Sequence, residues 1–277
     1  MSGARLLGLG LVVASLAACK AEAQTQAPMV EVERQAPVLF VDDEYGRDKS
    51  VNDYRHFIAA HEGDPEWALE VIDAHLGLGK LYRESNSRAA AEEQFGRVIE
   101  LFAEHGFESG TVEAARPAEA QFLLAEYAFE DAAKLQISAT DSEGIAAESQ
   151  AIFTALVDVA AAYDAVFPYR SLEWVLAAMF QRGFAFEQCA DTILGAPIPT
   201  ALDSDAARDA YVEIVEDQMA PLYDKAVALY EEIVARSEQF DVSTEWTQRA
   251  RERLRVYKPN EYPRSDATLA LEQEERR

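Results

Sequence analysis

Cysteine, glycine and proline are all scarce in this chain, which has 2, 13 and 10 of them among 277 residues. A glycine-rich phosphate loop and a Gly-x-Ser-x-Gly elbow are missing. With 50 acidic residues, neighbouring carboxylates arise by chance, and no pair stands out as a general acid and base. These absences exclude the common catalytic motifs. We therefore expect no enzymatic activity and no cofactor.

Groups that could bind a metal are equally few. No His-Glu-x-x-His motif and no close pair of cysteines occurs. His56 and His61 are five residues apart, a spacing that does not suit two ligands on one helical face. We expect no metal site.

Basic residues are half as frequent as acidic ones, 25 against 50, which gives a net charge of −25 at pH 7. Such a charge repels phosphate backbones, so we expect no nucleic-acid binding. It favours basic or weakly charged partners. The local exception is a cluster of arginines, Arg249, Arg251, Arg253 and Arg255. We expect them to pair with acids such as Glu245 and Glu252, or with acids of the preceding helical hairpin. Docking of an acidic partner or of a second copy is the alternative.

The apolar run near the N-terminus is too short to cross a membrane. It covers 13 residues, Leu6–Ala18, whereas a membrane-spanning helix needs about 20. Arg5 precedes the run, and small residues lie directly before Cys19. This arrangement suits the apolar core of a secretory signal.

The end of this run, Leu16-Ala17-Ala18-Cys19, resembles the lipobox of bacterial lipoproteins. The resemblance implies that residues 1–18 are a signal peptide and that a lipid on the Cys19 sulfur anchors the protein in a membrane. Because Lys20 rather than Asp follows, the resemblance also implies an outer-membrane lipoprotein that faces the periplasm. An ordinary secretory signal with an incidental cysteine is the alternative.

Lipidation of Cys19 would leave Cys189 without a disulfide partner. Cys189 lies close to the apolar residues Phe186, Ala190 and Ile193. We expect it to be buried and to act as a small apolar side chain.

The remaining chain divides into a tether, a helical domain and a tail. Residues 19–43 are polar and are expected to form a flexible tether, and residues 258–277 are expected to be a partly disordered acidic tail. Residues 44–257 show helical and no strand periodicity. The expected helices run from Pro65 to about Tyr82, from about Ala91 to before Gly106, and over about 112–131, 143–167, 172–194, 205–240 and 243–257. Pro221 is expected to kink the long helix or to split it at Ala220. The fold class we expect is all-α, made of antiparallel helical hairpins.

One hairpin carries a repeat signature. Leu78-Gly79-x-x-Tyr82 followed by Ala91-x-x-x-Phe95 resembles a tetratricopeptide repeat (TPR), a helix-turn-helix unit of 34 residues. The resemblance implies that Gly79 and Ala91 let two helices touch while Tyr82 and Phe95 fill the space beside them. His75, Val98 and Ala103 depart from the repeat pattern.

Weaker matches occur downstream. Gly183-x-x-Phe186 is similar to the first helix of a repeat, Ala226-x-x-x-Tyr230 is similar to the second, and Leu124-Ala125 matches loosely. Together these matches imply hairpins stacked as a TPR-like α-solenoid, or superhelix. The positions that line the concave groove of such a solenoid imply a partner-binding groove at Asp73, Lys80, Arg83 and Glu84. A solvated helix face with no partner is the alternative for these four residues.

Several further short motifs follow one another along the chain in an order that also carries a resemblance. These features are Arg170-Ser171-x-Glu173-Trp174, Ala196-Pro197-Ile198-Pro199, Pro221-Leu222-x-x-Lys225-Ala226, Glu245-Trp246-Thr247 and Glu261-Tyr262-Pro263. The order resembles repeat-containing envelope lipoproteins of myxobacteria and related deltaproteobacteria, some of which serve gliding motility. It implies a membrane-anchored scaffold that binds envelope proteins, within a motility or trans-envelope complex for example. The alternatives are a lipoprotein that binds a small ligand or polysaccharide, and an envelope hydrolase.

Overall fold

The computed structural model describes residues 50–263 of the chain. The expected signal peptide, the lipidated Cys19 and the tether of residues 19–43 lie outside the described residues. The same holds for residues 264–277 of the expected tail. The described residues thus cover most of the expected helical domain.

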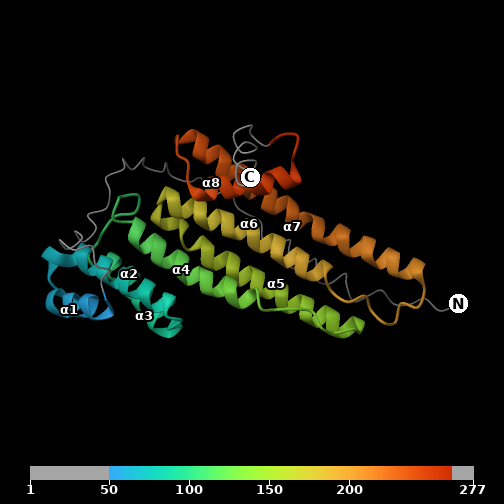
Figure 1. The fold of residues 1–277 in the computed structure, drawn as a ribbon, viewed down its shortest axis with the longest axis horizontal. Helices are drawn as coiled ribbons and strands as arrows, with labels where there is room; N and C mark the ends of the chain where they lie inside the picture. Colours follow the sequence, from blue (N-terminus) through green and yellow to red (C-terminus); the bar gives the residue numbers. More distant parts are fainter. Residues whose placement is uncertain (1–49, 264–277) are drawn as a thin grey trace, which may run out of the picture. The chain divides into compact units, whose positions relative to one another are not determined.

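The described residues are all-helical and contain no strand, which confirms the expected all-α class. Within residues 50–263, two short 3-10 helices, η3 and η4, accompany eight α-helices, α1–α8, which Figure 1 labels. In chain order the elements are α1 Val51–His61, η3 Pro65–Trp67, α2 Ala68–Glu84, α3 Arg88–Glu104, α4 Ala115–Ala132, α5 Ser142–Asp164, η4 Phe167–Tyr169, α6 Leu172–Leu194, α7 Asp205–Gln239 and α8 Glu245–Tyr257.

Helix α1 was not among the expected helices. A capping box starts it: the Ser50 side chain accepts from the Asp53 backbone N–H, and the Asp53 carboxylate accepts from Ser50. Ile58 is its one buried residue. Because its apolar stripe is this narrow, the periodicity that reveals a helix in a sequence is weak here.

Of the two expected effects of Pro221, a kink of α7 or a split at Ala220, the split does not occur. The helix continues from Asp205 to Gln239 with Pro221 inside it. Pro221 and Asp217, whose carbonyl loses its usual donor, are both exposed. Water can therefore hydrogen-bond the freed carbonyl, while Met219 and Leu222 remain buried on the other side of the helix.

The described chain forms two compact units. The first unit comprises residues 50–135 and 151–178, and the second comprises residues 136–150 and 179–263.

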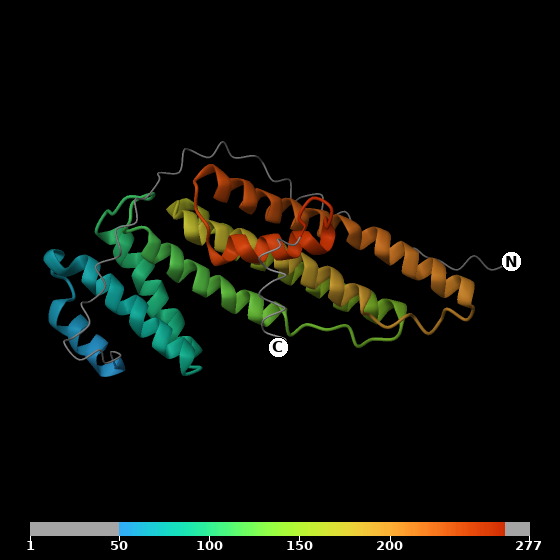
Figure 2. The same ribbon diagram turned by 45° about the horizontal axis from the view of Figure 1, so that its top comes forward.

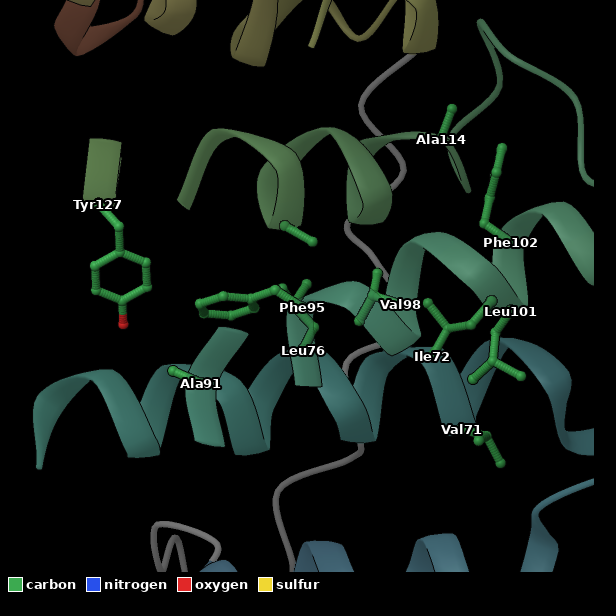
Figure 3. Packing of buried hydrophobic residues seen from close by; sticks show 11 residues of the cluster. Val71, Ile72, Leu76, Ala91, Phe95, Val98, Leu101, Phe102, Ala114 and Tyr127 are labelled. Atoms are coloured by element: carbon green, nitrogen blue, oxygen red, sulfur yellow. The ribbon is translucent and has the colours of Figure 1, made fainter. Parts of the chain in front are cut away.

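The core of the first unit lies among α2, α3 and α4, which pack on one another. Ile72 and Leu76 of α2 lie beside Val98 and Leu101 of α3 (Figure 3). Helix α1 packs on α2 through Ile58, which joins a smaller buried cluster with Ala74 and Leu78. The larger cluster consists of Val71, Ile72, Leu76, Ala91, Phe95, Val98, Leu101, Phe102, Ala114, Ala120 and Tyr127.

In the second unit α8 lies along α7, red beside orange in Figures 1 and 2. A capping box of Thr244 and Thr247 starts α8. The Thr247 hydroxyl also shares a buried hydrogen bond of 2.7 Å with Ser237 of α7. From α6, Phe180 contacts Trp246 of α8, with ring centroids 5.7 Å apart.

Among the described residues, one segment is long and apolar enough to cross a membrane by length and composition, Ser142–Tyr169. An interior helix of a folded protein meets the same criterion. Ile152, Leu156 and Val159 of this segment are buried. The segment therefore carries no conclusion about a membrane.

Candidate functional site

A groove of about 770 Å³ runs along α1, α2 and α3 in the first unit. Helices α1 and α3 both pack on α2, and side chains of all three line the groove. Its apolar part includes Ile58 and Ala59 of α1 and Leu78 and Tyr82 of α2. The charged and polar side chains that line it are Arg55, Glu62, His75, Glu92, Glu93, Gln94, Arg97 and Glu100.

His75 is a buried polar residue of the groove, with 6% of its surface exposed. Its Nδ1 lies 2.8 Å from Oε1 of Gln94, which also lines the groove. An amide oxygen only accepts, so Nδ1 carries the proton and Nε2 is an acceptor in the neutral ring. Among the described residues nothing donates to Nε2. Burial lowers the pKa of His75, which keeps the ring neutral at pH 7.

The charged rim of the groove has more carboxylates than cations, four against two. Arg97 is shared by Glu100 at 3.2 Å and Glu62 at 3.8 Å. Arg55 donates to the hydroxyl of Tyr82 at 2.5 Å. Arg97 is thus shared among several carboxylates and Arg55 binds a hydroxyl, so the charged residues of the groove keep a net negative charge.

Of the four residues predicted to bind a partner, Asp73, Lys80 and Glu84 lie on the opposite side of α2 from the groove, as the 3.6-residue helical period requires, and Arg83 lies at the edge between the two sides. Asp73 accepts two hydrogen bonds from Arg116 of α4, at 2.6 and 2.8 Å. This bidentate geometry is the strong form of the ion pair.

The other predicted residues on this face continue the contact with α4. Lys80 forms an ion pair with Glu119. The pKa of Glu119 is raised, because the effect of burial exceeds the opposing effect of the Lys80 charge. Arg83 lies 3.0 Å from Glu130 and stacks over the Tyr127 ring at 5.3 Å. Three of the four predicted side chains thus hold α2 against α4, and Glu84 at the end of the helix is exposed.

The predicted packing residues of the first hairpin lie at the contact between α2 and α3. A Cβ placed on Gly79 would lie 2.5 Å from the Phe95 ring, so the two helices meet where α2 has no side chain. Ala91 and Phe95 are fully buried, and Leu78 is buried. Tyr82 is half-buried at the edge of the same cluster.

The second unit repeats this contact between α6 and α7. A Cβ on Gly183 would lie 2.8 Å from the Tyr230 ring, and Ala226 and Tyr230 are fully buried. Phe186 is buried beneath the Lys225 ammonium, 5.5 Å from the ring centroid. In each unit a glycine therefore faces an aromatic ring that follows an alanine by four residues.

The second unit also contains a buried carboxylate. Glu187 of α6 has none of its surface exposed, and it lies 2.5 Å from the Arg253 guanidinium of α8. Burial, and to a lesser extent Glu187, raises the pKa of Tyr257 to about 12.

Besides Arg253, two more arginines of the cluster pair with acids: Arg251 with Glu238 at 3.0 Å, and Arg249 with Glu245 at 3.6 Å. The predicted pairing of the arginine cluster with nearby acids is confirmed for these three arginines.

The remaining candidates of the sequence are dispersed. His61 contacts the ring of Trp67 with centroids 4.5 Å apart, His105 is the C-cap residue after α3, and His56 is exposed. Cys189 is buried, as predicted, and burial raises the pKa of its thiol to about 12. Within residues 50–263 no three His, Cys, Asp or Glu side chains gather as metal ligands would.

The groove was not predicted, although part of its signal is in the sequence. His75, Leu78 and Tyr82 recur at helical spacing on α2, and His75 departs from the repeat pattern. The other wall depends on α1, which buries only Ile58 and therefore has no clear apolar period in the sequence. No protein-family model matches this chain, and no match was found among curated proteins or solved structures.

Proposed function

We propose that this chain is a lipid-anchored scaffold of the bacterial envelope, built as a TPR-like solenoid, that binds other envelope proteins. The observation that carries the proposal is the repeated close contact of a glycine with an aromatic ring. It occurs between Gly79 and Phe95 and again between Gly183 and Tyr230. A helical repeat needs this kind of contact, because the two helices of each hairpin must approach closely to form one unit that can stack on the next.

The packing of the first unit supports the solenoid. Helix α3 packs on both α2 and α4, and α2 also contacts α4 directly. Helix α2 thus contacts the next two helices along the chain, as in stacked helical hairpins. The contacts of Asp73 and Arg83 with α4 belong to this stacking. They join the first helix of one hairpin to the first helix of the next.

The groove on α1, α2 and α3 supports a binding function. It is open, partly apolar and lined by a rim of charge, which suits a segment of another protein. The anchor at Cys19 would keep this surface at the membrane, where the acyl chains of a lipoprotein hold firmly.

Photo-crosslinking in the bacterium that makes the protein tests this function. A photoreactive amino acid is placed in the full chain at Ala90 in the groove, at Glu84 on the opposite side of α2, or at the exposed Glu216 of α7. We expect discrete adducts with envelope proteins at Ala90 or Glu84 and none at Glu216. Absence of protein adducts at the first two positions, or adducts with polysaccharide alone, would contradict the proposed function.

A further inference from the structure

We propose that the groove on α1, α2 and α3 binds a lysine or arginine side chain of a partner segment, and that His75 accepts a hydrogen bond from it. This inference rests on the proposed function, because it names what the protein-binding surface recognises. Three observations carry it: an excess of carboxylates, an unpartnered buried acceptor and an apolar part of the wall.

The groove has more carboxylates than arginines to pair with them. Glu93 is exposed and has no ion-pair partner among the described residues. Glu62 shares Arg97 with Glu100 and Glu104. A cation brought by a partner would complete these pairs, and it would be attracted over a distance by the net charge of −25.

The imidazole of His75 is the second observation. Its Nδ1 is occupied by Gln94, and its Nε2 has no donor within residues 50–263. A buried acceptor without a hydrogen bond costs free energy, which a donor entering the groove would recover. Glu62 and Glu93, together with Arg97, are close enough to act on the charge of this ring. The acceptor and the carboxylates therefore lie in one part of the groove.

The apolar side chains of the groove explain why a protein side chain fits better than a free ion. Ile58, Ala59 and Leu78 line the groove together with the charged residues. Lysine and arginine have aliphatic stems that pack on apolar surface while their charged heads reach polar groups. A long apolar stem with a cationic end matches both parts of the wall.

A titration followed by NMR tests the inference on the full-length chain in detergent. The probe is the capped peptide Ac-Gly-Ser-Leu-Lys-Leu-Ser-Gly-NH2, and the control peptide has norleucine instead of lysine. The readout is the imidazole nitrogen resonance of Nε2 in His75, assigned by its loss in His75→Gln. We expect the lysine peptide to shift this resonance and to bind about tenfold more tightly than the norleucine peptide. Equal affinity of the two peptides would overturn the inference.

Two matched double variants distinguish the groove from the acidic surface as a whole. Glu62→Gln with Glu93→Gln removes two charges at the groove, and Glu216→Gln with Glu252→Gln removes two exposed charges from α7 and α8. We expect the groove variant to raise the Kd for the lysine peptide about tenfold and the control by less than about twofold. Equal effects would identify general attraction to an acidic protein and overturn the inference.

The same groove variant separates this inference from the proposed function. If envelope proteins still crosslink to the chain in undiminished yield when Glu62 and Glu93 are replaced, the scaffold function stands and the groove is not its cation-binding surface. If no envelope protein crosslinks to the unaltered chain, the proposed function itself fails.

Discussion

Two glycines on neighbouring helices, Gly79 of α2 and Gly96 of α3, differ in their surroundings. A Cβ on Gly79 would lie 2.5 Å from the Phe95 ring, whereas a Cβ on Gly96 would meet nothing within 4 Å. Both positions are helical, where alanine is intrinsically better than glycine by about 1 kcal/mol. The contact with Phe95 reverses the sign of that preference at Gly79 alone.

Gly79→Ala should therefore lower the free energy of unfolding by about 1–3 kcal/mol, as other overpacked core positions do. Gly96→Ala should raise it by about 0.5–1 kcal/mol. Urea denaturation of the two variants and the unaltered chain measures both effects. Equal changes at the two glycines would show that the α2–α3 contact does not depend on the missing side chain.

His75 makes stability depend on pH. Burial lowers its pKa below the ordinary value of 6.5, and the hydrogen bond to Gln94 opposes this only in part. Near pH 6.5 the unfolded chain takes up a proton that the folded chain does not, so stability is full above this pH and is lost as the pH falls below it. Below the folded-state pKa the loss stops growing.

Replacing His75 with Gln should remove this loss. The free energy of unfolding should fall less between pH 7.5 and pH 5.5 in His75→Gln than in the unaltered chain, as measured by urea denaturation at each pH. His56→Gln, which changes an exposed histidine of α1, should behave like the unaltered chain. Parallel pH profiles for His75→Gln and the unaltered chain would be inconsistent with a buried neutral histidine.

At the scale of elements, helices α2 and α4 are joined by ion pairs between their side chains as well as by apolar contacts. The Asp73 and Arg116 side chains are 21% and 11% exposed, and both oxygens of Asp73 accept from Arg116. Removing one partner of such a pair leaves the other charge partly buried without compensation. The pair between Asp73 and Arg116 therefore contributes to the free energy with which α2 packs on α4.

Asp73→Asn should lower the free energy of unfolding by about 1–3 kcal/mol, and a double-mutant cycle with Arg116→Met should show coupling between the two sites. Glu84→Gln, at an exposed position of the same helix, should change it by less than about 0.5 kcal/mol. Chemical denaturation of the unaltered chain, the three variants of the cycle and this control provides the measurement. Additive effects of Asp73→Asn and Arg116→Met would refute the coupling.

At the scale of the whole molecule, we expect a lipid on Cys19 to attach the protein to a membrane. Cys19→Ala should abolish incorporation of radiolabelled palmitate and move the protein from the membrane fraction to the soluble fraction. Cys189→Ala is the matched control: its thiol is buried, burial raises its pKa to about 12, and labelling should persist. An unaltered chain without palmitate would exclude the lipid anchor and leave a simple secretory signal.

The helices could be predicted where the apolar period is strong. The bounds expected for α6, about 172–194, are those of the structure, and α7 was expected at 205–240 and ends at Gln239. Helix α1 was missed because it buries one residue. A kink or a split at Pro221 was expected from the lost hydrogen bond. The split does not occur, because Asp217, whose carbonyl loses its donor, is exposed to water.

Sequence alone determined that the described chain is helical, because the apolar period and the breaking residues act within one helix and its turns. Tertiary structure decided what each polar face does. Asp73, Lys80 and Arg83 form a charged face whose sequence is the same whether water or α4 lies beside it. Likewise, nothing local shows that Glu187 is buried against Arg253, 66 residues away. Burial and charge pairing depend on distant segments, so they exist only once the helices have packed.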